Sequence, residues 1–224
     1  MSPTLRVFGD ATALHGALAD LLRAQLTFRR RSARALILPG GHTPEALYRQ
    51  LANESLTPSP ALHLLLSDER LVPPNSPQSN TRLVMDLVRS LRIDPGHFLA
   101  VRTSLPAADA ARDYHADIAR FVDGGGVMAL ALLGLGPDGH TAGLFDEEAL
   151  ATGRGRWAIA VRRPDGVEGV SLTPDALALA DRVVFACSGE SKRAIVDRCR
   201  VAPDSVLALR AVAGVPRVEL WYAN

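Results

Sequence analysis

The segment that decides the fold is Leu132–Phe145, which reads LLGLGPDGHTAGLF. It continues an apolar run that begins at Met128, and it contains four glycines, one aspartate and one histidine. The apolar run predicts a buried strand, and the glycines predict a loop whose backbone can approach a ligand closely. Two hypotheses follow: a dinucleotide-binding loop, because the glycines match G-x-G-x-x-G, or a catalytic loop formed by Asp138 and His140.

Length and composition limit the classes of protein. The chain has 224 residues, of which 47% are hydrophobic and 22% charged, and its formal net charge is +1. This balance predicts one domain over residues 1–224 and argues against a nucleic-acid partner. The first residues lack an apolar signal segment, and no run approaches the ~18 apolar residues of a membrane span. We therefore expect a cytoplasmic protein with no membrane partner.

The alternation of short apolar runs with longer amphipathic segments predicts the architecture. Several runs are apolar throughout, which is typical of strands covered on both faces. The order of strands and helices predicts an α/β, three-layer Rossmann-like domain, with a mostly parallel sheet and helices on both faces. The predicted strands are Ala35–Leu38, Leu62–Ser67, Met128–Leu133, Trp157–Val161, Arg182–Cys187 and Val218–Tyr222. The predicted helices are Ala11–Arg29, Pro44–Leu51, Asn80–Leu91, Ala107–Phe121 and Glu190–Cys199.

A glycine loop follows the first predicted strand, at the sheet edge where ligands of such folds bind. In LPGGHTPEALYRQL (Leu38–Leu51), Gly40 and Gly41 precede the helix. Thr43 is a good N-cap and Pro44 a favoured first helical residue. The free N–H groups of such a helix start bind anions, although no Walker lysine follows. The alternative is a plain strand-to-helix turn.

Charged residues follow the second predicted strand. The stretch Ser67–Arg70 reads SDER, and the long loop Val72–Asn80 comes after it. Two carboxylates beside an arginine at a strand end indicate the polar wall of a pocket. A solvated turn is the alternative.

The context of the glycine-rich segment fits a dinucleotide loop poorly. Gly143 falls where a helix should run, and Pro137 removes an N–H group that a pyrophosphate would bind. The next predicted strand ends in Arg162 and Arg163 rather than in an acidic residue, although arginines could suit the 2′-phosphate of NADP. A carboxylate that orients an imidazole fits the segment better, and a structural histidine in a turn is the alternative.

Lys192 is the only lysine of the chain. It falls in the first turn of a predicted helix, where a cation opposes the helix dipole. We expect a bound anion to compensate this charge. A solvated lysine is the alternative.

In order and spacing, these stretches resemble the 6-phosphogluconolactonases, which share a superfamily with the glucosamine-6-phosphate isomerases. The isomerase relatives carry an acidic residue after the histidine, whereas HTAGLF is apolar there, so the resemblance points to the lactonase branch. It runs almost end to end. The motifs that carry it are PGGHTP (Pro39–Pro44), SDERLVP (Ser67–Pro73) with Ser79 and Asn80, GLGPDGHTAGLF (Gly134–Phe145) and GESK (Gly189–Lys192).

The chain also departs from the family pattern. Pro39 and His42 stand where the family usually has serine. Gly169 stands where the family usually has an arginine that is associated with phosphate binding. We expect another arginine, Arg163 or Arg210, to take its place.

The resemblance implies hydrolysis of 6-phosphoglucono-1,5-lactone to 6-phosphogluconate, in the oxidative pentose phosphate pathway. A lactone needs an activated water, and His140 is the expected general base, since histidine side chains titrate near neutral pH. Asp138 or Asp68 is expected to hold the imidazole in the right tautomer. Arg70, or N–H groups of the glycine loop, is expected to stabilise the oxyanion.

The substrate phosphate is expected over Gly40, Gly41, His42 and Thr43, paired with Lys192. An imidazole at position 42 could supply part of the charge that is absent at position 169. The alternative is that this imidazole points to solvent.

No cofactor or metal is expected, because the six histidines show no HExxH-like spacing. The expected partner is a small sugar-phosphate lactone, and the expected state is a monomer or a weak homodimer. Two other functions stay open: isomerisation or deamination of a sugar phosphate on the same fold, and binding of NADP or a phosphosugar.

Overall fold

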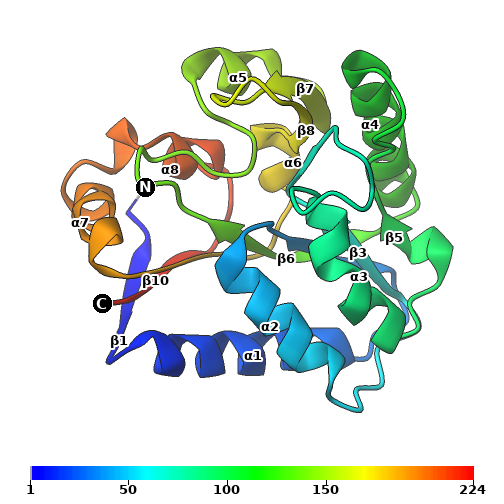
Figure 1. The fold of residues 1–224 in the computed structure, drawn as a ribbon, viewed down its shortest axis with the longest axis horizontal. Coiled ribbons are helices and arrows are strands. Elements are labelled where there is room, and N and C mark those ends of the chain that lie inside the picture. Colours follow the sequence, from blue (N-terminus) through cyan, green and yellow to red (C-terminus); the bar gives the residue numbers. More distant parts are fainter. Residues whose placement is uncertain (1) are drawn as a thin grey trace.

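The computed structural model describes residues 2–224, apart from the side chains of His42 and Thr43. Its centre is a seven-stranded sheet in which every neighbouring pair of strands is parallel (Figure 1). In spatial order the strands are β1 (Thr4–Phe8), β10 (Val218–Ala223), β9 (Val183–Ser188), β6 (Val127–Gly134), β2 (Arg34–Leu38), β3 (Leu62–Leu66) and β5 (Phe98–Leu99).

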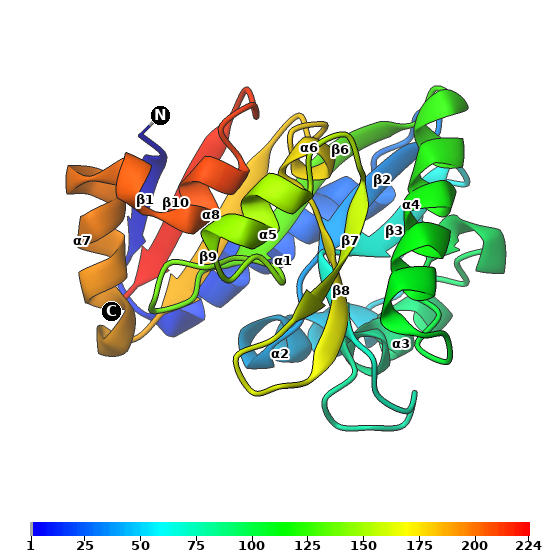
Figure 2. The same cartoon turned by 90° about the horizontal axis from the view of Figure 1, so that it is seen from above.

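Helices cover both faces of this sheet (Figure 2). One face carries α1 (Ala11–Thr27), α2 (His42–Ala52) and α3 (Asn80–Ser90), and the other carries α4 (Ala107–Asp123), α7 (Arg193–Val201) and α8 (Leu207–Ala211). Successive residues of β2 alternate between the two cores: Leu36 packs with α1–α3, and Ile37 packs in the opposite core. The predicted three-layer α/β fold is confirmed. The remaining helical segments are η1 (Pro95–His97), α5 (Glu147–Thr152), α6 (Pro174–Leu177), η2 (Glu190–Lys192) and η3 (Pro203–Ser205).

A second, antiparallel sheet lies over the face that carries α4. Its strands, in order, are β4 (Asp68–Arg70), β8 (Glu168–Leu172) and β7 (Ala158–Arg162). The strand predicted at Trp157–Val161 occurs as β7, but it belongs to this second sheet and not to the parallel one. The reason is the short connection after β7, where Gly166 has a φ of 83° and donates its N–H to the Arg163 carbonyl. This tight turn makes β7 and β8 a hairpin, which a crossover helix cannot do.

The other predicted elements occur, with small shifts at their ends. The predicted helix Glu190–Cys199 is divided: its first residues form the 3₁₀ turn η2, and the α-helix begins at Arg193. Strands β1, β4, β5 and β8 are absent from the predicted strands. β1, β4 and β5 lie at sheet edges, and β8, the central strand of the second sheet, begins with Glu168 and Gly169 and so lacks a continuous apolar run.

Two buried tyrosines hold the carboxyl ends of β2 and β3. Tyr48 of α2 donates its hydroxyl to the Pro39 carbonyl at 2.8 Å, and Tyr114 of α4 donates to the Leu66 carbonyl at 2.7 Å. Both side chains are almost fully buried, so these hydrogen bonds are shielded from water. The backbone where the two strands end is thereby fixed from both faces of the sheet.

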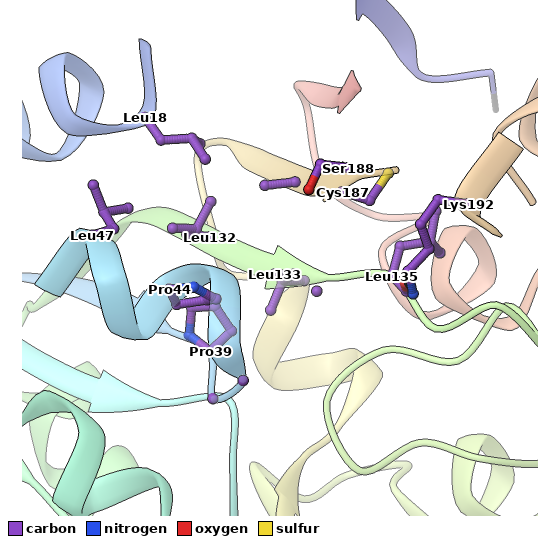
Figure 3. Close-up of a pocket in the computed structure, with 14 residues that line it drawn as sticks. Leu18, Pro39, Pro44, Leu47, Leu132, Leu133, Leu135, Cys187, Ser188 and Lys192 are labelled. Carbon is purple, nitrogen blue, oxygen red and sulfur yellow. The ribbon is translucent and has the colours of Figure 1, made fainter. Parts of the chain in front are cut away.

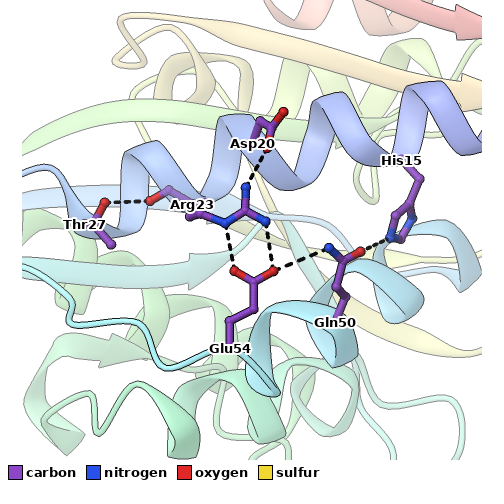
Figure 4. A network of polar contacts seen from close by, with 6 residues as sticks. All are labelled: His15, Asp20, Arg23, Thr27, Gln50 and Glu54. Carbon is purple, nitrogen blue, oxygen red and sulfur yellow. Dashed lines mark hydrogen bonds and ion pairs between the residues drawn. The ribbon is translucent and has the colours of Figure 1, made fainter.

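Helix α2 is also tied to α1 at the surface (Figure 4). Arg23 of α1 binds Glu54 with Nε and Nη2, at 2.7 and 2.8 Å. Gln50 links the same carboxylate to His15 of α1. Such surface networks contribute modestly to stability, but bidentate geometry fixes the relative position of the two helices.

At the amino end of the sheet, His63 of β3 stacks on His97 with ring centroids 4.0 Å apart. Phe121 packs on the same ring, and Asp117 and Arg120 line the adjoining cavity. Burial lowers the pKa of His63 below its ordinary value; the Ala61 carbonyl opposes this effect, and the neighbouring His97 adds to it.

This depressed pKa predicts a pH dependence of stability. The unfolded chain takes up the His63 proton before the folded chain does, so the free energy of unfolding should decrease as the pH falls below about 6.5. His63→Gln should make that decrease less steep. Urea denaturation of both proteins at several pH values between about 7.5 and 5.5 measures the difference. Parallel curves for the two proteins would contradict the prediction.

Candidate active site

A cleft lies at the carboxyl ends of the central strands, where the chain leaves β2 and β6 in opposite directions across the sheet. Such switch points are where open α/β sheets bind ligands. The cleft is open to solvent and is lined by residues that follow β2, β3 and β6, and by two side chains from elsewhere, Arg163 and Lys192. An apolar pocket adjoins it. Figure 3 shows Leu18, Leu47 and Leu132 on one side of this pocket and Lys192 on the other.

Asp138 and His140 form a hydrogen-bonded pair in the loop after β6. His140 Nδ1 lies 2.6 Å from Asp138 Oδ1, and the ring centroid of Phe145 lies 4.5 Å from that of His140. Burial raises the pKa of the Asp138 carboxyl, but hydrogen bonds from His140 lower it by more, so this pKa lies below its ordinary value. A carboxylate at Nδ1 leaves Nε2 of the ring free to accept a proton.

The glycines of this loop serve the Asp138–His140 pair. A β-carbon on Gly136 would lie 2.2 Å from His140 Nδ1, so only glycine leaves room for the ring. Gly139 has a φ of 99°, a conformation that glycine adopts without strain. After Gly139 the next helix is the short α5, which begins only at Glu147. The loop therefore lacks the helix start on which a dinucleotide fingerprint depends.

Asp68 and Arg70 lie across the cleft, where Asn80 joins them. Asp68 accepts hydrogen bonds from the Ser67 hydroxyl at 2.8 Å and from Asn80 Nδ2 at 3.3 Å. Arg70 donates through Nη1 to Asn80 Oδ1 at 2.9 Å. Its buried Nε has no hydrogen-bond partner among the described residues. Of the two aspartates that the sequence offered as partners of His140, Asp138 is the one in contact with the ring.

Asn80 and Glu69 support the site through hydrogen bonds that the sequence did not predict. Glu69 is buried and accepts hydrogen bonds from the backbone N–H groups of Asn80 and Thr81 at 2.7 and 2.6 Å. Its carboxylate thus binds the N-terminus of α3 and places Asn80 in the cleft. The sequence signal was the Ser-Asn pair that follows SDERLVP.

Lys192 and Arg163 bring positive charge to the cleft. Lys192 donates its ammonium to the Leu135 carbonyl at 2.6 Å from the turn η2, so the expected conflict with a helix dipole is relieved by a carbonyl partner. Arg163 is 18% exposed, and its Cζ lies 5.1 Å from the Phe145 ring centroid. Its Nε lies 3.4 Å from an Asp165 oxygen.

The structure distinguishes between Arg163 and Arg210, the two arginines that could replace the family arginine absent at position 169. Arg163 lines the cleft, whereas Arg210 donates two hydrogen bonds to the Glu147 carboxylate. Gly169 is buried in β8 opposite Arg70, and a β-carbon on it would lie 2.7 Å from the Glu69 carbonyl oxygen. A side chain at position 169 would therefore require β4 and β8 to separate.

The glycine loop after β2 forms the remaining wall. Gly40 and Gly41 line both the cleft and the adjoining pocket, and Gly41, with a φ of 106°, directly precedes α2. The proposed roles of the His42 and Thr43 side chains lie outside the described residues.

Two further properties of the described chain bear on the site. Among the described His, Cys, Asp and Glu side chains, which do not include His42, no three gather in a cluster that could hold a metal ion. The helices of residues 2–224 include none with the length and hydropathy that a membrane span requires.

Comparisons with known proteins agree with this architecture. The family model described as glucosamine-6-phosphate isomerases/6-phosphogluconolactonase matches residues 9–217. The 6-phosphogluconolactonase of Thermotoga maritima is 38% identical over 161 residues, 70% of each chain. That of Rhizobium meliloti is 31% identical over 221 residues, 95% of this chain and 94% of the relative. The crystal structure of the Thermotoga maritima protein superposes with a TM-score of 0.82 over 99% of both chains, at 28% identity. The chain belongs to the glucosamine-6-phosphate isomerase/6-phosphogluconolactonase family.

Proposed function

We propose that this protein hydrolyses 6-phospho-D-glucono-1,5-lactone to 6-phospho-D-gluconate, the second step of the oxidative pentose phosphate pathway. The observation that carries the proposal is the Asp138–His140 pair, with Nδ1 and Oδ1 2.6 Å apart, whose imidazole lines a cleft that also holds Arg163 and Lys192. The names of the relatives supply the substrate.

His140 acts as the general base in this mechanism. Its Nε2 accepts a proton from a water molecule as the water oxygen bonds to the lactone carbonyl carbon. Asp138 holds the ring through Nδ1 and stabilises the imidazolium that forms. The tetrahedral intermediate then breaks its bond to the ring oxygen, which takes the proton back from the imidazolium and becomes a hydroxyl group.

Arg70 stabilises the negative charge that develops on the carbonyl oxygen. Its Nη1 is engaged with Asn80 and with the Gln78 carbonyl, which fixes the guanidinium, while its buried Nε has no partner in the described part of the chain. A guanidinium that is already held in place needs little reorganisation when the oxyanion forms. Backbone N–H groups of the glycine loop are a second source of such donors.

Arg163 and Lys192 bind the substrate phosphate, with the Gly40–Gly41 loop beneath it. The backbone of this loop opens into α2, whose free N–H groups favour an anion. Arg163 has the weaker protein partner of the two arginines considered, so its guanidinium is available for the bidentate contact that phosphate prefers.

Isomerisation or deamination is the less favoured chemistry in this cleft. None of the four residues directly after His140 carries a carboxylate. Thr141 donates its hydroxyl to the Gly134 carbonyl, Ala142 and Gly143 have no polar side chain, and Leu144 is buried and apolar.

Replacement of His140 tests the general base. The His140→Asn protein should fold normally and lose about 10²- to 10⁴-fold in kcat, because general-base catalysis contributes rates of that order. The measurement is hydrolysis of freshly generated 6-phosphogluconolactone, corrected for its spontaneous reaction. His97→Asn, at the opposite edge of the sheet, is the matched control and should keep wild-type kcat. Near-normal kcat in folded His140→Asn would exclude the assigned role.

Replacement of the two cations tests the phosphate site. Arg163→Ala and Lys192→Ala should each lower kcat/KM for the phosphorylated lactone by roughly 10- to 100-fold, the value of a charge-assisted hydrogen bond. Hydrolysis of unphosphorylated gluconolactone should change much less. Arg210→Ala is the control, because Arg210 is paired with Glu147. If both lactones lose equally, the altered residue does not bind the phosphate.

A further inference from the structure

Helix α7 reaches the Asp138–His140 loop from outside at two points. From the turn before the helix, Lys192 donates to the Leu135 carbonyl at 2.6 Å. From within the helix, Arg198 donates through Nη2 to the Asp138 carbonyl at 2.8 Å. Lys192 lines the cleft, whereas Arg198 is absent from its lining residues and contacts only the backbone of the loop among the hydrogen bonds of the described chain.

The loop is packed closely against this arginine. A β-carbon on Gly139 would lie 2.5 Å from Arg198 Nη2. The Gly139 carbonyl accepts a hydrogen bond from the Ala208 N–H at 2.8 Å, where α8 begins. The two consecutive carbonyls of residues 138 and 139 are therefore held from two different helices.

Such external contacts matter because the loop itself is rich in glycine. Glycine restricts the backbone less than any other residue, and three of the eight residues of Gly136–Gly143 are glycine, so hydrogen bonds must hold this turn. Inside the loop the Gly136 N–H donates to the His140 carbonyl at 2.8 Å, and α7 and α8 hold the carbonyls between them from outside. The direction of the Asp138 carbonyl fixes the peptide plane between Asp138 and Gly139. That plane determines how the Asp138 carboxylate and the His140 ring, two residues apart, face each other.

We infer that Arg198 is a positioning residue for the Asp138–His140 pair: its guanidinium holds the Asp138 carbonyl and thereby keeps the carboxylate aligned with the imidazole. The catalytic part of this inference rests on the proposed function. Arg198 does not line the cleft, so its effect on the reaction is expressed through the geometry of the pair.

The same helix supplies a matched control. Arg200 lies two residues after Arg198, is similarly exposed, and pairs with Asp197 at 3.7 Å instead of with the loop. Arg198→Ala and Arg200→Ala remove the same side chain from the same helix, and only the first removes a contact to the loop. Arg198→Lys keeps the positive charge but loses the planar guanidinium, so it should restore part of the function.

Kinetics give the first test. Arg198→Ala should lower kcat for 6-phosphogluconolactone by about tenfold, since a 1 Å misplacement of a catalytic group can cost up to roughly 100-fold. KM should change little. The kcat of Arg198→Lys should lie between those of the wild type and Arg198→Ala, and the kcat of Arg200→Ala should match that of the wild type. The melting temperature of Arg198→Ala should stay near that of the wild type, because the lost contact is at the surface. An effect confined to KM would overturn the inference, since it would mean contact with substrate.

A titration of Asp138 by ¹³C NMR of its carboxyl gives a test that needs no activity. In the native protein the pKa of this carboxyl is held below its ordinary value by His140. Misalignment of the pair weakens those hydrogen bonds, so the pKa should rise toward the ordinary value in Arg198→Ala and stay unchanged in Arg200→Ala. If the wild type hydrolyses no lactone, the proposed function fails, and this titration still decides the role of Arg198. An unshifted Asp138 in Arg198→Ala would overturn the inference.

Discussion

The close packing of Gly40 against Asn80 is the constraint on which the cleft depends. A β-carbon at position 40 would lie 1.9 Å from the Asn80 amide oxygen. That amide also binds the main-chain carbonyl of Asp68 and the guanidinium of Arg70. A single side chain thus joins the segments that follow β2 and β3 to the start of α3, and the absence of a side chain at position 40 lets the three meet.

Much of the fold could be predicted because its information is local. The central strands are apolar on both faces, and the strand–helix alternation indicates a parallel sheet. The partners of the predicted strand Trp157–Val161 could not be derived, because an apolar run does not specify its partner strands; the tight turn at Gly166 does. The partner of Lys192 could not be predicted for the same reason: its ammonium in η2 donates to a carbonyl 57 residues away in sequence.

In the candidate site too, contacts between residues close in sequence could be predicted, and contacts between distant segments could not. Asp138 and His140 are two residues apart, so their pairing follows from the loop itself. The His140 ring lies so close to position 136 that only glycine fits there. The choice between Arg163 and Arg210 could not be made from the sequence, because it depends on Glu147, which engages Arg210 from a distant segment. The glycine at position 169 likewise has its reason in the approach of β4 to β8.

The residues that hold the loop after β6 from outside are synthesised after the loop itself. The loop after β6 is held by donors 57 and 60 residues later in the chain. Of the two strands that flank β6, β2 precedes the loop and β9 follows it. During synthesis the glycine-rich loop emerges before these donors and β9 exist. A nascent chain that ends before α7 would therefore carry both Asp138 and His140, with the hydrogen bonds inside their loop, but without the contacts from Lys192 and Arg198. Closing such distant contacts costs more chain entropy than forming local ones, so we expect these two contacts to form after the local elements of the fold.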